Sequence, residues 1–202
     1  MSTDFYHTID TSSTVEFKDR GSRFLAFAYH VNTADDFKTY RAQLKKEHPK
    51  ANHHCFAYRV GVDGNNFRVS DDGEPSGTAG RPILGQIDSY SLTNVLIIVV
   101  RYFGGTLLGV PGLINSYKTS AALALQHAAI LQKPVLIYYR LQFDYMLLND
   151  VMKMVKQYDC LIVKQELQLF CLLEIGIAKN KTADVLMKLN ELRGIEINVI
   201  TD

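Results

Sequence analysis

Tryptophan is absent from the 202 residues, and cysteine and proline are scarce, with three and five residues. Cys55, Cys160 and Cys171 are odd in number and have no CxxC spacing. This pattern predicts reduced thiols, and neither a disulfide framework nor a metal site. No apolar run approaches the ~20 residues that span a membrane, and the first ten residues lack the basic and apolar regions of a signal peptide. We therefore expect a cytoplasmic protein with no membrane partner.

An excess of charge of either sign is also missing, because the formal net charge is +1. Fourteen Lys and Arg residues face 12 Asp and Glu residues up to position 134, and eight face nine beyond it. A duplex-DNA binder needs a strongly basic surface, so no duplex-DNA partner is expected. Local basic patches are compatible with this composition.

The first two thirds of the chain predict an α+β domain over residues 1–134. Strands are expected at 24–31, 53–61, 66–70 and 94–102, the last with a continuous apolar run that suits burial on both faces. A helix is predicted from Thr33, as N-cap, to His48 before Pro49. A second, alanine-rich helix is predicted from Leu113 to Leu131, close to Pro134.

The remaining residues, 135–202, predict a second domain. A strand from Val135 is followed by an amphipathic helix at 146–158, and residues 160–177 hold two strands with Lys164–Glu166 as the turn between them. A helix at 182–193 and a strand at 195–200 complete the order β-α-β-β-α-β. This order is that of the ferredoxin-like fold.

One segment, GLINSYKT, almost matches the phosphate-binding loop G-x-x-x-x-G-K-[ST]. Tyr117 stands where the motif needs a glycine, whose backbone N–H groups close around the phosphates. Lys118 lies inside the predicted helix instead of at its start. The sequence therefore argues against this type of site.

The turn-rich stretch SDDGEPSGTAGRP, residues 70–82, places three carboxylates within four residues. Asp71, Asp72 and Glu74 repel one another unless they are solvated, paired with cations or bound to N–H groups. Two interpretations are open: a solvated turn or cap of the following helix, or a pocket wall that binds a cationic group or positions a water. Arg81 closes the same stretch.

The stretch RYFGGTLLG begins with a charged residue at the end of a buried strand. Arg101 is costly there unless a carboxylate of the acidic loop or an external phosphate meets it. Gly104 and Gly105 allow close backbone approach or a positive φ. His53 and His54 are consecutive on a predicted strand, so they point to opposite faces and cannot share one metal ion.

Four segments together resemble the YigZ-like branch of the IMPACT family. They are RGSRFLAFA, HPKANHHCFAYR, SDDGEPSGTAGRPIL and VVRYFGGTLLGVPGL, and the similarity covers nearly the whole chain. The resemblance implies an N-terminal domain like domain 2 of ribosomal protein S five and a ferredoxin-like C-terminal domain resembling domain V of elongation factor G. One departure is Pro111, where the family usually has glycine; any ligand-binding role of the backbone there is in doubt.

Eukaryotic members of that family regulate translation and carry an additional RWD domain, whose partner binding is not expected here because the sequence begins at the shared domain. The resemblance implies a translation-associated protein that contacts RNA or the ribosome, has no cofactor, and is a binding protein more than an enzyme. The family motif residues form the expected site: Arg23, His53, His54, Asp71, Asp72, Glu74, Arg81, Arg101, Gly104 and Gly105. The expected RNA contacts are Arg20, Arg23, Arg41, Lys45, Lys46 and Arg59.

An alternative of a different class is an enzyme or sensor. In that interpretation the acidic loop and the segment after Arg101 form a pocket for a small phosphorylated or cationic metabolite. A third interpretation treats both segments as packing devices, since buried Arg–carboxylate pairs often serve structure alone.

Overall fold

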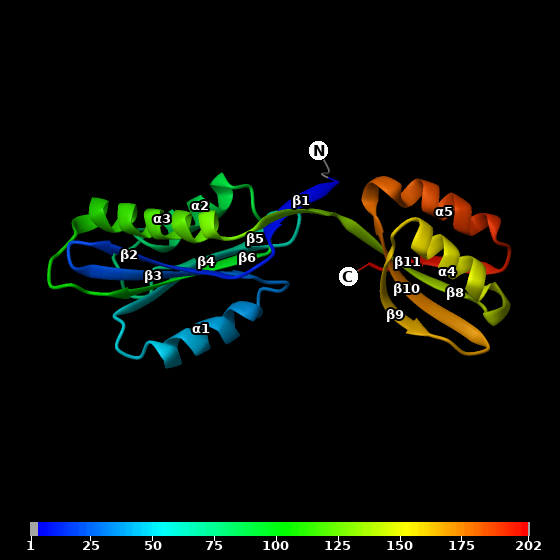
Figure 1. Ribbon diagram of the computed structural model, residues 1–202, viewed down its shortest axis with the longest axis horizontal. Helices are drawn as coiled ribbons and strands as arrows, with labels where there is room; N and C mark the ends of the chain where they lie inside the picture. Colours follow the sequence, from blue (N-terminus) through cyan, green and yellow to red (C-terminus); the bar gives the residue numbers. More distant parts are fainter. Residues whose placement is uncertain (1–3, 202) are drawn as a thin grey trace. The chain divides into compact units, whose positions relative to one another are not determined.

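The computed structural model describes residues 4–201 and divides into two compact units. One unit contains residues 6–133, and the other contains residues 134–201 together with residues 4 and 5. Each unit has its own hydrophobic core (Figure 1). No helix among the described residues is long and apolar enough to cross a membrane.

The first unit is built on a five-stranded antiparallel sheet with the order β2-β3-β6-β4-β5. Its strands are β2 (Ser13–Asp19), β3 (Ser22–His30), β4 (His53–Val60), β5 (Asn66–Ser70) and β6 (Val95–Tyr102). A separate two-stranded sheet pairs β1 (Phe5–Ile9) with β7 (Ile130–Pro134).

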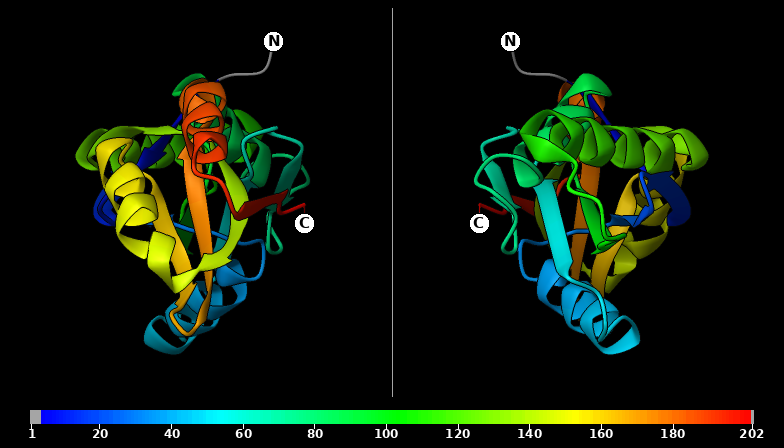
Figure 2. Two further views of the ribbon diagram at one scale, coloured as in Figure 1. Left: turned by 90° about the vertical axis from the view of Figure 1, so that its right-hand side faces the viewer. Right: turned by 90° about the vertical axis from the view of Figure 1, so that its left-hand side faces the viewer.

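Helices cover both faces of the five-stranded sheet, as Figures 1 and 2 show. On one face lie α2 (Gly80–Ser89) and α3 (Gly109–His127), and on the other lies α1 (Asp36–Glu47). Successive side chains of β6 alternate between two cores: Val95, Ile97 and Val99 face α2 and α3, whereas Leu96, Ile98 and Val100 face α1. The prediction of a strand buried on both faces is therefore confirmed.

The second unit has the element order predicted from the sequence, β-α-β-β-α-β. Its elements are β8 (Leu136–Asp144), α4 (Leu148–Gln157), β9 (Leu161–Glu166), β10 (Phe170–Ala178), α5 (Thr182–Glu191) and β11 (Ile195–Val199), with single 3-10 turns at 145–147 and 179–181. The antiparallel sheet has the order β11-β8-β10-β9. Buried side chains of α4 and α5 share one core with β8 and β10.

Several predicted boundaries are wrong. Helix α3 begins at Gly109, four residues before Leu113, because the ring of Pro111 is tolerated in the first turn of a helix, where an N–H has no intrahelical partner. It ends at His127, and the apolar segment after it is strand β7 instead of a last helical turn. Helix α1 begins at Asp36, which accepts hydrogen bonds from the backbone N–H groups of residues 32 and 33.

The turn predicted at Lys164–Glu166 is also misplaced. These residues belong to β9, and the chain reverses at residues 167–169. All six residues of β9 are exposed at the edge of its sheet, so polar residues are tolerated within the strand and do not mark its end. Strands β1 and β2 were not predicted as elements. Helix α2 was expected only as the helix after the acidic stretch in the capping interpretation, without bounds.

Candidate functional site

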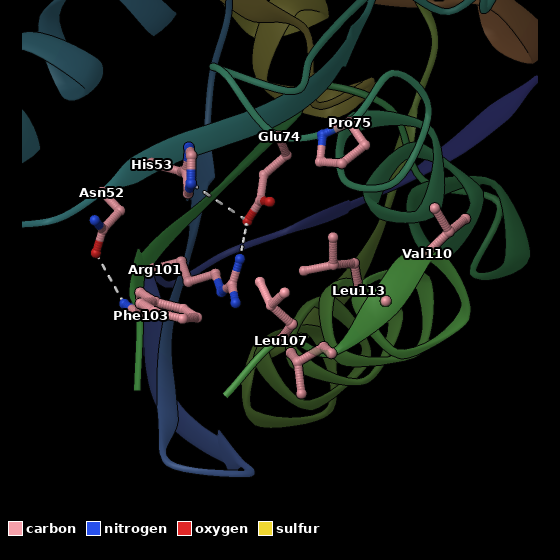
Figure 3. Close-up of a pocket in the computed structure, with 11 residues that line it drawn as sticks. Asn52, His53, Glu74, Pro75, Arg101, Phe103, Leu107, Val110 and Leu113 are labelled. Carbon is pink, nitrogen blue, oxygen red and sulfur yellow. Dashed lines mark hydrogen bonds and ion pairs between the residues drawn. The ribbon is translucent and has the colours of Figure 1, made fainter. Parts of the chain in front are cut away.

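A pocket of about 450 Å³ lies in the first unit on the face covered by α2 and α3, at the end of the sheet where β4 begins and β6 ends. Its floor is polar and its walls are apolar (Figure 3). The lining residues are Asn52, His53, Glu74, Pro75, Arg101, Phe103, Leu107, Leu108, Gly109, Val110 and Leu113. The acidic loop and the segment after Arg101 thus meet in one pocket.

Glu74 is the carboxylate of the acidic loop that meets Arg101. Arg101 donates from Nη1 to Oε1 of Glu74 over 2.6 Å, and both side chains are buried. The hydroxyl of Tyr117 donates to the same oxygen over 2.8 Å, and Nε2 of His53 lies 3.8 Å from it. The register of the sheet makes this possible, since β4 and β6 pair His53 with Arg101.

The guanidinium of Arg101 is buried, with its side chain only 6% exposed. Nη2 donates to Oγ of Ser22 over 3.3 Å, and the rings of Phe24 and Phe103 lie 5.4 and 5.7 Å from Cζ. Nε is buried without a hydrogen-bond partner among residues 4–201. An external phosphate would therefore have to displace Glu74 before it could pair with Arg101.

Tyr117 and Cys55 extend the buried network below the pocket, and neither was expected at the site. Cys55 donates from Sγ to the carbonyl of Asp71 and also lies 3.3 Å from the hydroxyl of Tyr117. Burial raises the pKa of the Cys55 thiol and that of the Tyr117 phenol. The raised pKa values favour the protonated forms, in which Tyr117 donates to Glu74 and the Cys55 thiol is a poor nucleophile.

Asp71 caps α2. Its Oδ1 accepts from the backbone N–H groups of Ala79 and Gly80 over 3.0 and 2.8 Å, and its Oδ2 accepts from Gly77 over 2.8 Å. Partial burial raises the pKa of this carboxyl, but the three N–H groups outweigh that effect and hold the pKa below its usual value. The capping interpretation therefore applies to Asp71 alone of the three carboxylates.

Asp72 points to the other face of the sheet, where α1 lies. It pairs with Arg41 over 2.7 Å, lies 3.8 Å from Nζ of Lys45, and accepts the backbone N–H of His54 over 2.8 Å. Burial opposes ionisation of Asp72, but these donors and cations keep its pKa low. Burial also lowers the pKa of His54, and Asp72 only partly offsets it.

The other expected site residues lie away from the pocket. Arg23 pairs with Glu16 over 2.9 Å on the α1 side of β3, and Arg81 is exposed on α2. Gly104 packs against the turn between β2 and β3, where an added Cβ would lie 1.9 Å from the carbonyl carbon of Gly21. Gly105 has φ +85° with open space around it. Of the ten expected residues, His53, Glu74 and Arg101 line the pocket, and none of the described residues forms a metal-binding cluster of three or more His, Cys, Asp or Glu.

Some of the expected RNA-contacting cations form ion pairs within the protein, and others do not. Arg23, Arg41 and Arg59 form ion pairs with Glu16, Asp72 and Asp88, respectively. Within residues 4–201, Arg20 and Lys46 take part in no ion pair that the structure shows. The apolar residues of the walls, Phe103, Leu107, Leu108, Val110 and Leu113, were not predicted as site residues. Of this segment only Arg101, Gly104 and Gly105 were predicted, from the charge of the arginine and the backbone freedom of the glycines.

Comparison with known proteins identifies the family of the chain. Residues 20–125 match the family model of the Impact N-terminal domain. The chain is 35% identical over 178 residues to the IMPACT family member YigZ of Escherichia coli strain K12, and the match covers 87% of each chain. It is 33% identical over 146 residues to the IMPACT family member YvyE of Bacillus subtilis strain 168, and that match covers 72% of this chain and 67% of the relative. A crystal structure described as a hypothetical protein superposes with a TM-score of 0.79 at 31% identity and covers 99% of both chains. The resemblance seen in the sequence is thereby confirmed, and the chain belongs to the IMPACT family and is similar to its member YigZ.

Proposed function

We propose that this chain is a cytoplasmic, translation-associated regulatory protein that contacts RNA or the ribosome and acts by binding, not by catalysis. Membership of a family whose eukaryotic members regulate translation supports this proposal. Two observations support a binding role: Cys55 is buried with a raised pKa, and Glu74 is paired with Arg101 over 2.6 Å.

The observation that carries the proposal is a group of cations at one end of the five-stranded sheet, which we name the basic rim: Lys18, Arg20, Arg23, Lys45, Lys46 and Lys50. Pairing of Lys18 with Arg23, and of Arg23 with Tyr102, places the end of β2, the start of β3 and the end of β6 together. The last turn of α1 leads through Pro49 into β4 at this same end (Figure 1).

The basic rim is only partly neutralised by the protein. Glu16 accepts Lys18 over 3.1 Å and Arg23 over 2.9 Å. Within the described residues, Arg20, Lys46 and Lys50 are in no ion pair that the structure shows, and all three are exposed. Phosphates of RNA bind such cations with release of counterions, so a nearly neutral chain can still carry a local RNA-binding surface.

The test is binding of purified ribosomes and of a short single-stranded RNA to the full chain at increasing salt. Wild type is expected to bind at about 50 mM salt and to lose affinity with a log–log slope of about −0.7 per phosphate contact. A triple variant, R20A/K46A/K50A, should make the slope less steep by about 2, because three phosphate contacts are lost. The matched control replaces Lys153, Lys156 and Lys188 in the second unit and should leave the slope unchanged. Absence of binding at low salt overturns the proposal.

We propose the finer fold assignments on similar grounds. The strand order β11-β8-β10-β9 and the β-α-β-β-α-β sequence support a ferredoxin-like second domain, residues 135–202. The first domain, residues 1–134, is proposed to share the fold of domain 2 of ribosomal protein S five.

A sensor or enzyme for a small metabolite is the second candidate, because the pocket combines a buried charged pair with apolar walls. Thermal-shift screening with nucleotides and divalent cations tests it, and a bound ligand should raise the melting temperature by mass action. The closed pair of Glu74 and Arg101 argues against a phosphate as the group that binds there.

A further inference from the structure

We infer that the pocket beside the basic rim binds one unstacked nucleobase of a single-stranded RNA. This inference rests on the proposed RNA contact and names the part of the RNA that the site would take. Three observations support it: the pocket walls are apolar, the charges of Arg101 and Glu74 in its floor neutralise each other, and acceptor atoms in the floor have no hydrogen-bond partner in the part of the chain that the structure describes.

The walls of the pocket expose large apolar side chains to water. Leu107 is 83% exposed, Val110 51% and Phe103 45%. Together with the buried Leu113 they line a single concave site. Apolar groups gathered around a pocket with a few polar atoms are typical of a binding site for a largely apolar group.

The floor of the pocket has no net charge to offer. Arg101 and Glu74 neutralise each other over 2.6 Å, with side chains only 6% and 4% exposed. A charged ligand would lose its hydration without gaining a free counter-charge, which costs free energy in a buried site. A neutral ligand with hydrogen-bond donors avoids this cost.

Two acceptor atoms are available to such a ligand. Oε1 of Glu74 receives Arg101 and Tyr117, whereas Oε2 takes part in no hydrogen bond shown among residues 4–201. In Figure 3 this second oxygen points away from His53. Because a carbonyl only accepts, Nδ1 of His53 carries the hydrogen bonded to the carbonyl of Asp72 over 2.9 Å. In the ring form with this single N–H, Nε2 is the acceptor.

Phe103 supplies a flat surface that is held in place. Its backbone N–H donates to Oδ1 of Asn52 over 2.8 Å, and its ring lies 5.7 Å from the guanidinium carbon of Arg101. A half-exposed aromatic ring backed by a guanidinium is a platform on which a base can stack. The ring of its neighbour Tyr102, on the α1 side of the sheet, lies 5.7 Å from the guanidinium carbon of Arg23 in the basic rim. A strand whose base enters the pocket would reach these cations by passing around the end of the sheet.

The acceptors also predict a base preference. Carboxylates accept hydrogen bonds from the exocyclic amino groups of bases, as in the pairing of Glu with cytosine. Cytosine, adenine and guanine have such an amino group, whereas uracil has none. We therefore expect the pocket to prefer cytosine or adenine over uracil.

The experiment measures binding of the full chain to hexamers of cytidine, adenosine and uridine at one fixed salt concentration. Phe103→Ala and Leu107→Ser should each weaken binding of the cytidine or adenosine hexamer about tenfold, as expected for a lost stacking surface, and leave the salt slope unchanged. A cytidine hexamer with one abasic position at its centre should bind more weakly than the intact one. Phe67→Ala is the matched control, because Phe67 is 52% exposed on β5 and does not line the pocket.

Different results would overturn the RNA contact and the base pocket. If wild type binds all hexamers with a salt slope but Phe103→Ala and Leu107→Ser bind as wild type does, the base pocket is overturned and the RNA contact stands. Equal affinity for uridine and the other hexamers overturns the base preference. If wild type binds no RNA at low salt, both the contact and the pocket are overturned.

Discussion

Arg101 and Glu74 come from segments 27 residues apart and meet over 2.6 Å below a pocket that both of them line. The pair joins the end of β6 to the acidic loop, and Tyr117 of α3 is a second donor to Glu74. This arrangement serves stability and site geometry together, because the same contacts that hold the loop also set the charge of the pocket floor.

Glu74→Ala is expected to lower the free energy of unfolding by about 3–5 kcal/mol, because it leaves Arg101 as a buried charge without a partner. Urea unfolding at pH 7 measures this change. The double variant Glu74→Leu/Arg101→Met removes both charges and should recover most of the loss. A single variant as stable as wild type would show that the pair contributes little.

Asp71→Ala should destabilise the protein by about 0.5–2 kcal/mol, the usual range for a lost helix cap. In this variant the backbone N–H groups of Ala79 and Gly80 at the start of α2, and that of Gly77 in the preceding loop, lose their acceptor. Asp71→Asn, which keeps one acceptor oxygen, should lose less. Urea unfolding compares the two, and equal losses would contradict the capping role.

The sequence predicted that the acidic loop and the segment after Arg101 lie together, but it could not assign the three carboxylates of the loop. Asp71, Asp72 and Glu74 lie within four residues, yet they point to a helix terminus, to α1 and to the pocket. Asp72 has φ +42° and Gly73 has φ +90°, and these left-handed residues separate the directions of the side chains. An Asp-Gly pair favours such a turn, but it does not show which partner each neighbouring carboxylate then meets.

The register of the sheet was likewise invisible in the sequence. Alternation placed His53 and His54 on opposite faces, but only the pairing of β4 with β6 sets His53 opposite Arg101. Strand β6 could be predicted, because a strand buried on both faces has apolar residues at almost every position. A strand with one exposed face alternates apolar and polar residues instead. The edge strand β9 could not be bounded, since its exposed residues carry no such signal.

The stability of the protein should fall between pH 7 and pH 5 through His54. Burial lowers the pKa of His54 in the folded state, so the unfolded chain binds the proton first, near its ordinary pKa of 6.5. The contribution is complete above that pKa and is lost as pH falls toward the folded pKa. Urea unfolding at several pH values measures it, and His54→Gln should flatten the profile. An unchanged profile in that variant would contradict the assignment.

Gly104→Ala should be far more destabilising than Gly105→Ala. A Cβ at Gly104 would overlap the backbone of Gly21 and Ser22, which cannot move without opening the turn between β2 and β3. Gly105 has open space around it and pays only for its φ of +85°, roughly 1–2 kcal/mol. Thermal unfolding ranks the variants, and a reversed order would contradict the close packing of Gly104.

Pro111→Gly tests the position where this chain departs from the family pattern. Pro111 is the third residue of α3, and Pro82 is the third residue of α2, so both rings restrict the unfolded chain at positions where the helix accepts them. Each Pro→Gly change is expected to lower the free energy of unfolding by at least about 0.4–1 kcal/mol. Pro111 does not line the pocket, so Pro111→Gly should bind RNA as wild type does. Tighter binding by Pro111→Gly, without the same gain in Pro82→Gly, would instead assign the backbone N–H at that point a ligand-binding role that the proline blocks.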